Sequence, residues 1–155
     1  AAQFAMAGIE APHSAIDGRY GFLPLYGQSP DYEALTASGP AAIHEISLKP
    51  YSCCRLLHSM IDGLREVTDN FSIPFERIES IRVTGPSKLP QQHVIRRPGT
   101  PMAAQYSLPF TVGATLAFGP HRFDAYESAN LGNADVLRWG DKVEVGEDAE
   151  FERLY

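Results

Sequence analysis

The chain has little of what marks a secreted, membrane-spanning or nucleic-acid-binding protein. Its 155 residues include only two cysteines, Cys53 and Cys54, and these are adjacent. Neighbouring cysteines rarely form a structural disulfide, so we expect a reducing, cytoplasmic location. No apolar run approaches the ~20 residues that a membrane-spanning helix needs, so we expect no membrane partner.

A basic excess is also lacking. The 13 Lys and Arg residues are outnumbered by 19 Asp and Glu residues, which gives a net charge of −6. Nucleic-acid-binding proteins usually carry a clear basic excess, so we expect no nucleic-acid partner. The composition, 44% hydrophobic and 21% charged, is that of a globular domain with a buried core.

Helical patterns dominate the chain. Apolar residues recur at helical spacing from Cys53 or Arg55 to about Phe71, which predicts an amphipathic helix. A second long helix, rich in alanine and interrupted by Pro109, is expected over 102–118. Shorter helices are expected over 31–37, 124–131 and 133–139.

Strand patterns are few and short. Strands are predicted over 43–49, where apolar and polar residues alternate, over 75–83 and over 143–145. A basic polar loop that includes Arg96 and Arg97 is expected over 88–99. A small number of strands separated by helices indicates an α+β fold in which a small sheet packs with helices.

One segment, Lys49 to His58, concentrates the reactive residue types at a predicted strand-to-helix turn. A helix start offers free N–H groups and a positive dipole end, which favour a bound carboxylate. Arg55 would clamp that carboxylate in a bidentate way. The dipole and Arg55 are expected to lower the thiol pKa of Cys53 or Cys54. Lys49, partly desolvated, would serve as a base.

The same segment has plainer interpretations. Helical spacing places Arg55, His58, Asp62 and Arg65 on one polar stripe, and such a stripe is most often a solvated helix face. Adjacent cysteines are usually small buried residues.

Other chemistries receive less support from the sequence. A zinc site would draw on Cys53, Cys54, His58 and His44, without the usual two-residue spacer between cysteines. Arg96 and Arg97 would contact an acidic ligand or lie in a solvated loop. The sequence has neither a glycine-rich phosphate loop nor a nucleophile elbow.

Three segments in order resemble the MmgE/PrpD family. These are Gly18–Phe22, then Ser47–Arg55 with His58 and Asp62 after it, and Met102–Phe110. The family includes 2-methylcitrate dehydratase, cis-aconitate decarboxylase and iminodisuccinate epimerase. The resemblance implies the smaller lid domain of a two-domain enzyme whose other domain is all-helical. Residues 1–8 would then be the tail of a helix from that domain, and residues 9–146 the α+β lid. Residues 147–155 would be the start of the return of the chain into the helical domain.

The resemblance also implies an activity. Family members act at a carbon next to a carboxylate of a small di- or tricarboxylate, without a metal or an organic cofactor, and tend to be homodimers. Lys49 matches the motif's lysine and is expected to be catalytic or substrate-binding. His58 matches a recurrent histidine. Tyr106 would donate a proton, bind a carboxylate or simply pack its helix, and Arg55 and Cys54 would bind the substrate.

One departure from the family pattern narrows the expected reaction. Dehydratase and decarboxylase members carry shorter or histidine-bearing segments around Cys53–Arg55. An epimerase only removes and returns a proton, so the sequence favours an epimerase of iminodisuccinate type. The alternatives are a hydro-lyase or decarboxylase, and a non-catalytic lid or interface domain.

Overall fold

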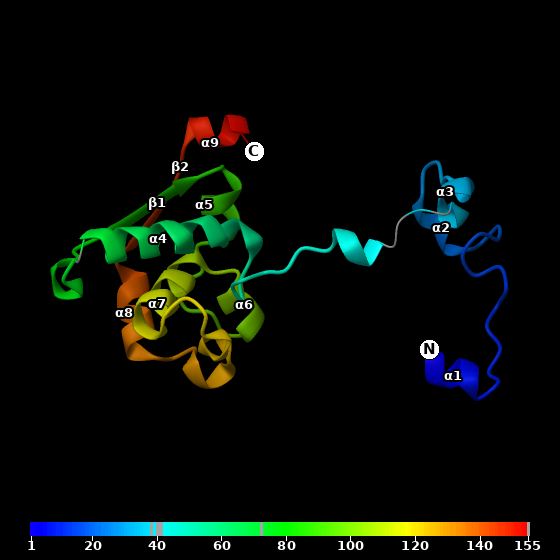
Figure 1. Ribbon diagram of the computed structural model, residues 1–155, viewed down its shortest axis with the longest axis horizontal. Helices are drawn as coiled ribbons and strands as arrows, with labels where there is room; N and C mark the ends of the chain where they lie inside the picture. The colour runs from blue at the N-terminus through cyan, green and yellow to red at the C-terminus, as the bar shows by residue number, and fades with distance from the viewer. Residues whose placement is uncertain (38, 40–41, 72, 155) are drawn as a thin grey trace. The chain divides into compact units, whose positions relative to one another are not determined.

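The computed structural model describes residues 1–37, 39, 42–71 and 73–154 (Figure 1). The chain divides into two compact units, Ala1–Ser47 and Leu48–Tyr155. Among the described residues, buried hydrophobic side chains occur only in the second unit.

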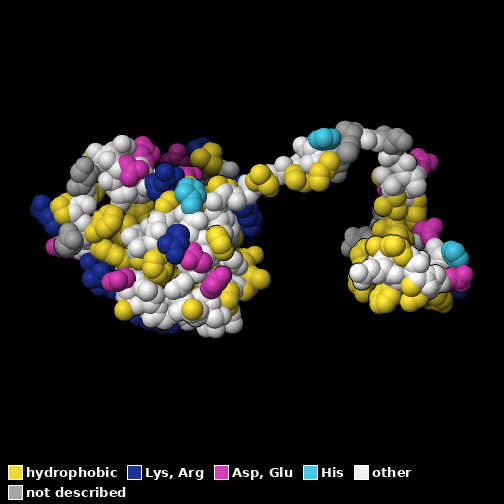
Figure 2. Space-filling view, turned by 60° about the horizontal axis from the view of Figure 1, so that its bottom comes forward, with side chains coloured by type: hydrophobic (Ala, Val, Ile, Leu, Met, Phe, Trp, Pro, Cys, Tyr) yellow, Lys and Arg dark blue, Asp and Glu magenta, His cyan; other side chains and the backbone are white. Residues whose placement is uncertain are grey.

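The first unit consists of short helices. These are α1 (Ala2–Met6), α2 (Phe22–Tyr26), α3 (Tyr32–Thr36) and the 3-10 turn η1 (Ala42–Glu45). Asp31 caps α3 as expected, because its carboxylate accepts hydrogen bonds from two backbone N–H groups at 3.0 Å. No hydrophobic side chain in the described part of this unit is buried. Figure 2 shows hydrophobic side chains gathered on its surface.

The predicted strand over 43–49 is wrong. The segment begins within η1 and continues as exposed, irregular backbone to Lys49. Alternating apolar residues stabilise a strand only when a neighbouring strand and an apolar layer are present to receive it. Neither meets this segment within the part of the chain that the structure describes.

The second unit is built around a buried helix. α7 (Leu108–Phe118) buries every residue from 108 to 115 and packs against α4 (His58–Phe71) and α8 (Ala134–Asp141). At Gly113 an added Cβ would lie 2.1 Å from the backbone oxygen of Val136, so glycine permits the close approach of α7 and α8. The amphipathic helix expected from Arg55 to Phe71 is confirmed as η2 (Arg55–Leu57) followed by α4.

The predicted helix over 102–118 is two helices. α6 (Pro101–Gln105) ends at Tyr106, and α7 starts after Ser107, whose hydroxyl accepts a hydrogen bond from the Phe110 N–H at 3.0 Å. Pro109 therefore stands in the first turn of α7, where its missing N–H has no helical partner to lose. The helix is therefore interrupted before the proline, and the chain bends at Tyr106.

A two-stranded parallel sheet completes the α+β fold. β1 (Ile81–Gly85) pairs with β2 (Val143–Glu147), from Ile81 opposite Val143 to Gly85 opposite Glu147. The strand predicted over 75–83 thus starts later, because Phe75–Arg77 forms the 3-10 turn η3. The expected α+β class is confirmed, with two strands in the described residues where three were predicted.

Short elements connect these layers. They are α5 (Lys88–Gln92), the 3-10 turns η4 (Phe123–Tyr126) and η5 (Ser128–Asn130), and α9 (Ala149–Leu154). The predicted loop over 88–99 therefore begins as a helix. Its Arg96 donates hydrogen bonds to the backbone oxygens of Gly140 and Val143 at 2.8 and 2.7 Å, so this guanidinium anchors the loop to the end of α8. Arg97 forms an ion pair with Asp141.

None of the helices in residues 1–37, 42–71 and 73–154 combines the length and apolar character needed to cross a membrane.

Candidate functional site

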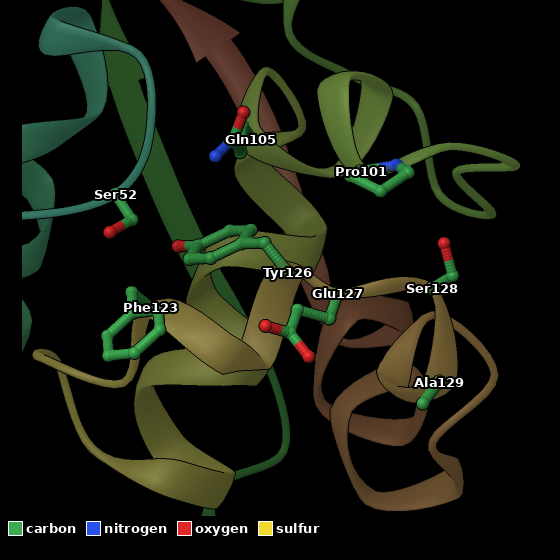
Figure 3. A pocket seen from close by; sticks show the side chains of 8 residues that line it. All are labelled: Ser52, Pro101, Gln105, Phe123, Tyr126, Glu127, Ser128 and Ala129. Carbon is green, nitrogen blue, oxygen red and sulfur yellow. The ribbon is translucent and has the colours of Figure 1, made fainter.

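The two motif segments of the second unit meet in space. The Cys54 N–H donates a hydrogen bond to the backbone oxygen of Gln105 at 2.8 Å, which joins the 49–58 segment to the end of α6. Beside this junction lies an open pocket of about 570 Å³ (Figure 3). It is lined by Ser52, Pro101, Gln105, Phe123, Tyr126, Glu127, Ser128 and Ala129. The pocket therefore lies between both motifs and the η4–η5 segment.

The lining of this pocket mixes polar and apolar side chains and carries one negative charge. Figure 3 shows the Tyr126 hydroxyl on the side of Ser52, and the Glu127 carboxylate extending toward the side where the Phe123 ring lies. The Tyr126 hydroxyl donates to Thr111 Oγ1 at 3.5 Å. Glu127 is the only charged residue among the eight that line the pocket.

Cys53, which lies in the 49–58 segment beside the pocket, is buried. Its side chain is 5% exposed, and burial raises the pKa of its thiol from its usual value to about 11, against the lowering effects of Tyr126 and Lys49. Burial also raises the pKa of the Tyr126 hydroxyl. The predicted lowering of the thiol pKa is wrong for Cys53. The regular turns of α4 begin only at His58, and desolvation outweighs nearby positive charge.

His58 is not part of a solvated stripe. It is 7% exposed, its Nε2 lies 3.4 Å from the backbone oxygen of Cys53, and its ring meets the Tyr51 ring edge-on at 5.2 Å. The His121 ring stacks on Tyr51 at 5.2 Å. The predicted exposed stripe is therefore wrong at His58, because the histidine turns inward against the aromatic ring of Tyr51.

Asp62 and Arg65 are connected through Tyr51. The Tyr51 hydroxyl donates a hydrogen bond to the Asp62 carboxylate, which with burial raises the pKa of the tyrosine, while Arg65 opposes that rise. This cluster fastens the start of the motif to the outer face of α4.

The other predicted site residues, Lys49, Cys54, Arg55 and Tyr106, are not among the residues that line the pocket. Lys49 and Arg55 are exposed, Cys54 is half-buried, and Tyr106 is 47% exposed at the bend between α6 and α7. Lys49 lies near enough to Cys53 to influence its pKa. The residues next to the predicted ones, Ser52 and Gln105, are those that reach the pocket.

Sequence reasoning missed His93. It is 1% exposed, and its Nδ1 lies 2.7 Å from the Tyr106 backbone oxygen, an acceptor, so Nδ1 carries the proton and donates. Its Nε2 has no hydrogen-bond partner within the described residues. Its ring stacks on the Tyr106 ring at 5.9 Å and 10°, and its backbone oxygen accepts from the Leu108 N–H. The sequence around His93 is that of a polar loop, and such a sequence does not predict a buried histidine.

The donor set proposed for zinc is not assembled. Within residues 48–71 and 73–154, no group of three or more His, Cys, Asp or Glu side chains is placed to hold a metal ion. Both cysteines are free thiols.

A comparison with known protein families shows to which family the chain belongs. The profile of the MmgE/PrpD C-terminal domain matches residues 51–155, more than half of the chain. The chain belongs to the MmgE/PrpD family. Members of the MmgE/PrpD family are generally enzymes. The matched range begins two residues after Lys49 and leaves Gly18–Phe22 outside. No curated protein matched the chain.

Proposed function

We propose that this MmgE/PrpD chain is part of a cofactor-independent enzyme that removes the proton next to a carboxylate of a small di- or tricarboxylate. The proposed reaction is epimerisation of an iminodisuccinate-type substrate. The observation that carries the proposal is the hydrogen bond between Cys54 and Gln105, which brings the two family motifs to one pocket.

Lys49 is the proposed base. The lone pair of its Nζ takes the proton from the α-carbon, and the C–H electron pair moves onto the adjacent carboxylate. Return of a proton to the opposite face of the same carbon gives the epimer, and no other bond breaks. Tyr106, exposed at the α6–α7 bend, is the proposed source of that proton. Exchange with water then returns a proton to its oxygen and removes the one that Lys49 gained.

Arg55 and Cys54 are the proposed substrate-binding residues. The Arg55 guanidinium suits a bidentate contact with a carboxylate. The Cys54 N–H already donates to Gln105, so only its thiol remains as a weak donor. His58 is buried against Tyr51 and the Cys53 carbonyl, and we assign it the role of holding the motif turn in place.

Proton NMR of the full-length protein in D₂O tests the reaction. The enzyme is incubated with a panel of citrate-, aconitate- and aspartate-derived acids. Exchange of the α-proton with inversion, and no loss of water or CO₂, is expected. A new olefin would instead establish a hydro-lyase, and CO₂ release a decarboxylase. Absence of any exchange or reaction would support a non-catalytic lid or interface.

Lys49→Ala tests the assigned base. We expect turnover to fall about 10²- to 10⁴-fold, the range that a positioned acid–base group supplies. Lys88→Ala, which removes another exposed lysine in α5, is the matched control and should leave turnover near the wild-type value. Thermal unfolding of both variants is compared with that of the wild type, so that a loss of turnover is separated from a loss of folding. Unchanged turnover in Lys49→Ala would refute the assignment.

A further inference from the structure

We propose that His93 is a positioning residue for Tyr106. This inference rests on the proposed function, in which Tyr106 supplies the proton that returns to the substrate carbon. It adds to the site a residue that lies outside the motif segments, and it gives a reason for the histidine that is buried beside the α6–α7 bend.

The first argument is that His93 contacts both the backbone and the ring of Tyr106. Its Nδ1–H donates to the Tyr106 backbone oxygen at 2.7 Å, and the two rings stack with their centroids 5.9 Å apart and their planes at 10°. Both contacts come from outside α6 and α7, whereas the Tyr106 N–H donates to Met102 within α6 at 3.2 Å. His93 therefore helps to set the direction in which the tyrosine hydroxyl projects.

The second argument is that His93 is itself held at several points. It directly follows α5, and its side chain is 1% exposed. Its backbone oxygen accepts from the Leu108 N–H at 2.8 Å, and the Ser107 hydroxyl donates to the backbone oxygen of Ile95. Together with the bond to Tyr106, these contacts tie the segment after α5 to three consecutive residues of the bend. A side chain locked in this way can hold its partner in one geometry.

The third argument is the second nitrogen of the His93 ring. Because Nδ1 carries the proton, Nε2 is an acceptor, and it is buried without a hydrogen-bond partner among the described residues. Burying a polar atom without a partner is unfavourable for folding, so an apolar side chain would suit the core better at this position. What the histidine provides, and an apolar residue does not, is the hydrogen bond to Tyr106. An effect on Tyr106 therefore explains this residue better than packing alone.

The test compares two amide variants that place the donor differently. In His93→Asn the amide N–H takes the position of Nδ1, whereas in His93→Gln it lies one bond farther out, near the position of Nε2. Both are measured in the full-length enzyme, with kcat and KM determined separately. We expect His93→Asn to keep most of kcat. We expect His93→Gln to lower kcat about ten- to a hundredfold with KM little changed, since a reacting group that is misplaced by about 1 Å costs up to this factor.

Tyr106→Phe removes the hydroxyl that His93 is proposed to position. Its own loss of turnover should be about 10²- to 10⁴-fold, the range of a positioned acid–base group. Adding His93→Gln to Tyr106→Phe should lower kcat no further, because both substitutions disable the same step. Val136→Ala is the control for a loss of packing, since Val136 is fully buried on α8. Its effect on kcat should be the same factor with and without the tyrosine hydroxyl.

Nitrogen NMR of the full-length protein, with isotope-labelled histidine, checks the geometry without measuring activity. The signals that disappear in His93→Asn belong to His93. We expect them to show the proton on Nδ1, as the hydrogen bond to the Tyr106 oxygen requires. A proton on Nε2 alone would overturn the inference, even if a variant failed to fold.

The outcomes separate the two proposals. Equal kcat in His93→Asn and His93→Gln, or a loss from His93→Gln that persists in the Tyr106→Phe background, would overturn the positioning role and leave the proposed function standing. Full turnover in Tyr106→Phe would overturn the assignment of Tyr106 and the positioning role with it. Absence of proton exchange on every acid of the panel would overturn the proposed function as a whole, and this inference with it.

Discussion

At the scale of single residues, burial decides how Cys53 behaves. Its thiol lies in a segment rich in groups that would activate a nucleophile, yet desolvation raises its pKa to about 11. A thiolate is the reactive form of cysteine, so a raised pKa makes the residue inert at neutral pH. We therefore interpret Cys53 as a packing residue beneath the site.

This interpretation predicts a pH profile for alkylation. In a Cys54→Ser variant, iodoacetamide should modify Cys53 at pH 8 about a hundredfold more slowly in the folded protein than in urea, because two pKa units separate the states. The folded-state rate should keep rising with pH toward 11, whereas the unfolded-state rate should level off above about 9. Mass spectrometry follows the reaction, and equal rates in both states would contradict a buried thiol.

Single residues also show where sequence reasoning reached its limit. Lys49, Arg55 and Tyr106 could be singled out because they lie in motifs, but Glu127 and His93 lie in segments without one. Helical spacing predicts an exposed position for His58, because spacing gives the face on which a residue lies and not what packs on that face. Only the fold reveals that Tyr51 covers it.

At the scale of elements, the contact between α7 and α8 depends on the missing side chain of Gly113. We predict that Gly113→Ala destabilises the protein by about 3 kcal/mol or more, since the new methyl would meet the rigid backbone oxygen of Val136. Gly63→Ala, in α4 with nothing within 4 Å, should instead stabilise by about 0.5–1 kcal/mol. Urea denaturation measures both, and similar effects of the two substitutions would contradict the close packing.

Elements with a strong internal pattern were predicted well from the sequence. α4 followed from apolar spacing alone, because a helix satisfies its own backbone groups and needs only one covered face. The strand over 43–49 failed because a strand needs a partner, which local alternation cannot supply. The split of 102–118 depended on Ser107 acting as a cap, and the sequence offered Pro109 as the only marker of the break.

At the scale of the whole molecule, the hydrophobic core lies entirely after Ser47. Every buried hydrophobic side chain among the described residues lies from Tyr51 onward. We predict that a fragment of residues 48–155 unfolds cooperatively on heating, as followed by circular dichroism. A fragment of residues 1–47 should show no cooperative transition. Loss of cooperativity in the 48–155 fragment would mean that the first unit contributes to the core.

The parallel pairing of β1 and β2 also sets an order of events during synthesis. Arg82 pairs with Glu144, 62 residues later. At about 5 to 20 residues per second, β1 leaves the ribosome roughly 3 to 12 s before its partner strand exists. Its backbone groups stay unpaired in the nascent chain for that time, while the helices between the strands are completed. A slow codon stretch within 86–142 would lengthen this interval and increase the yield of aggregated chain.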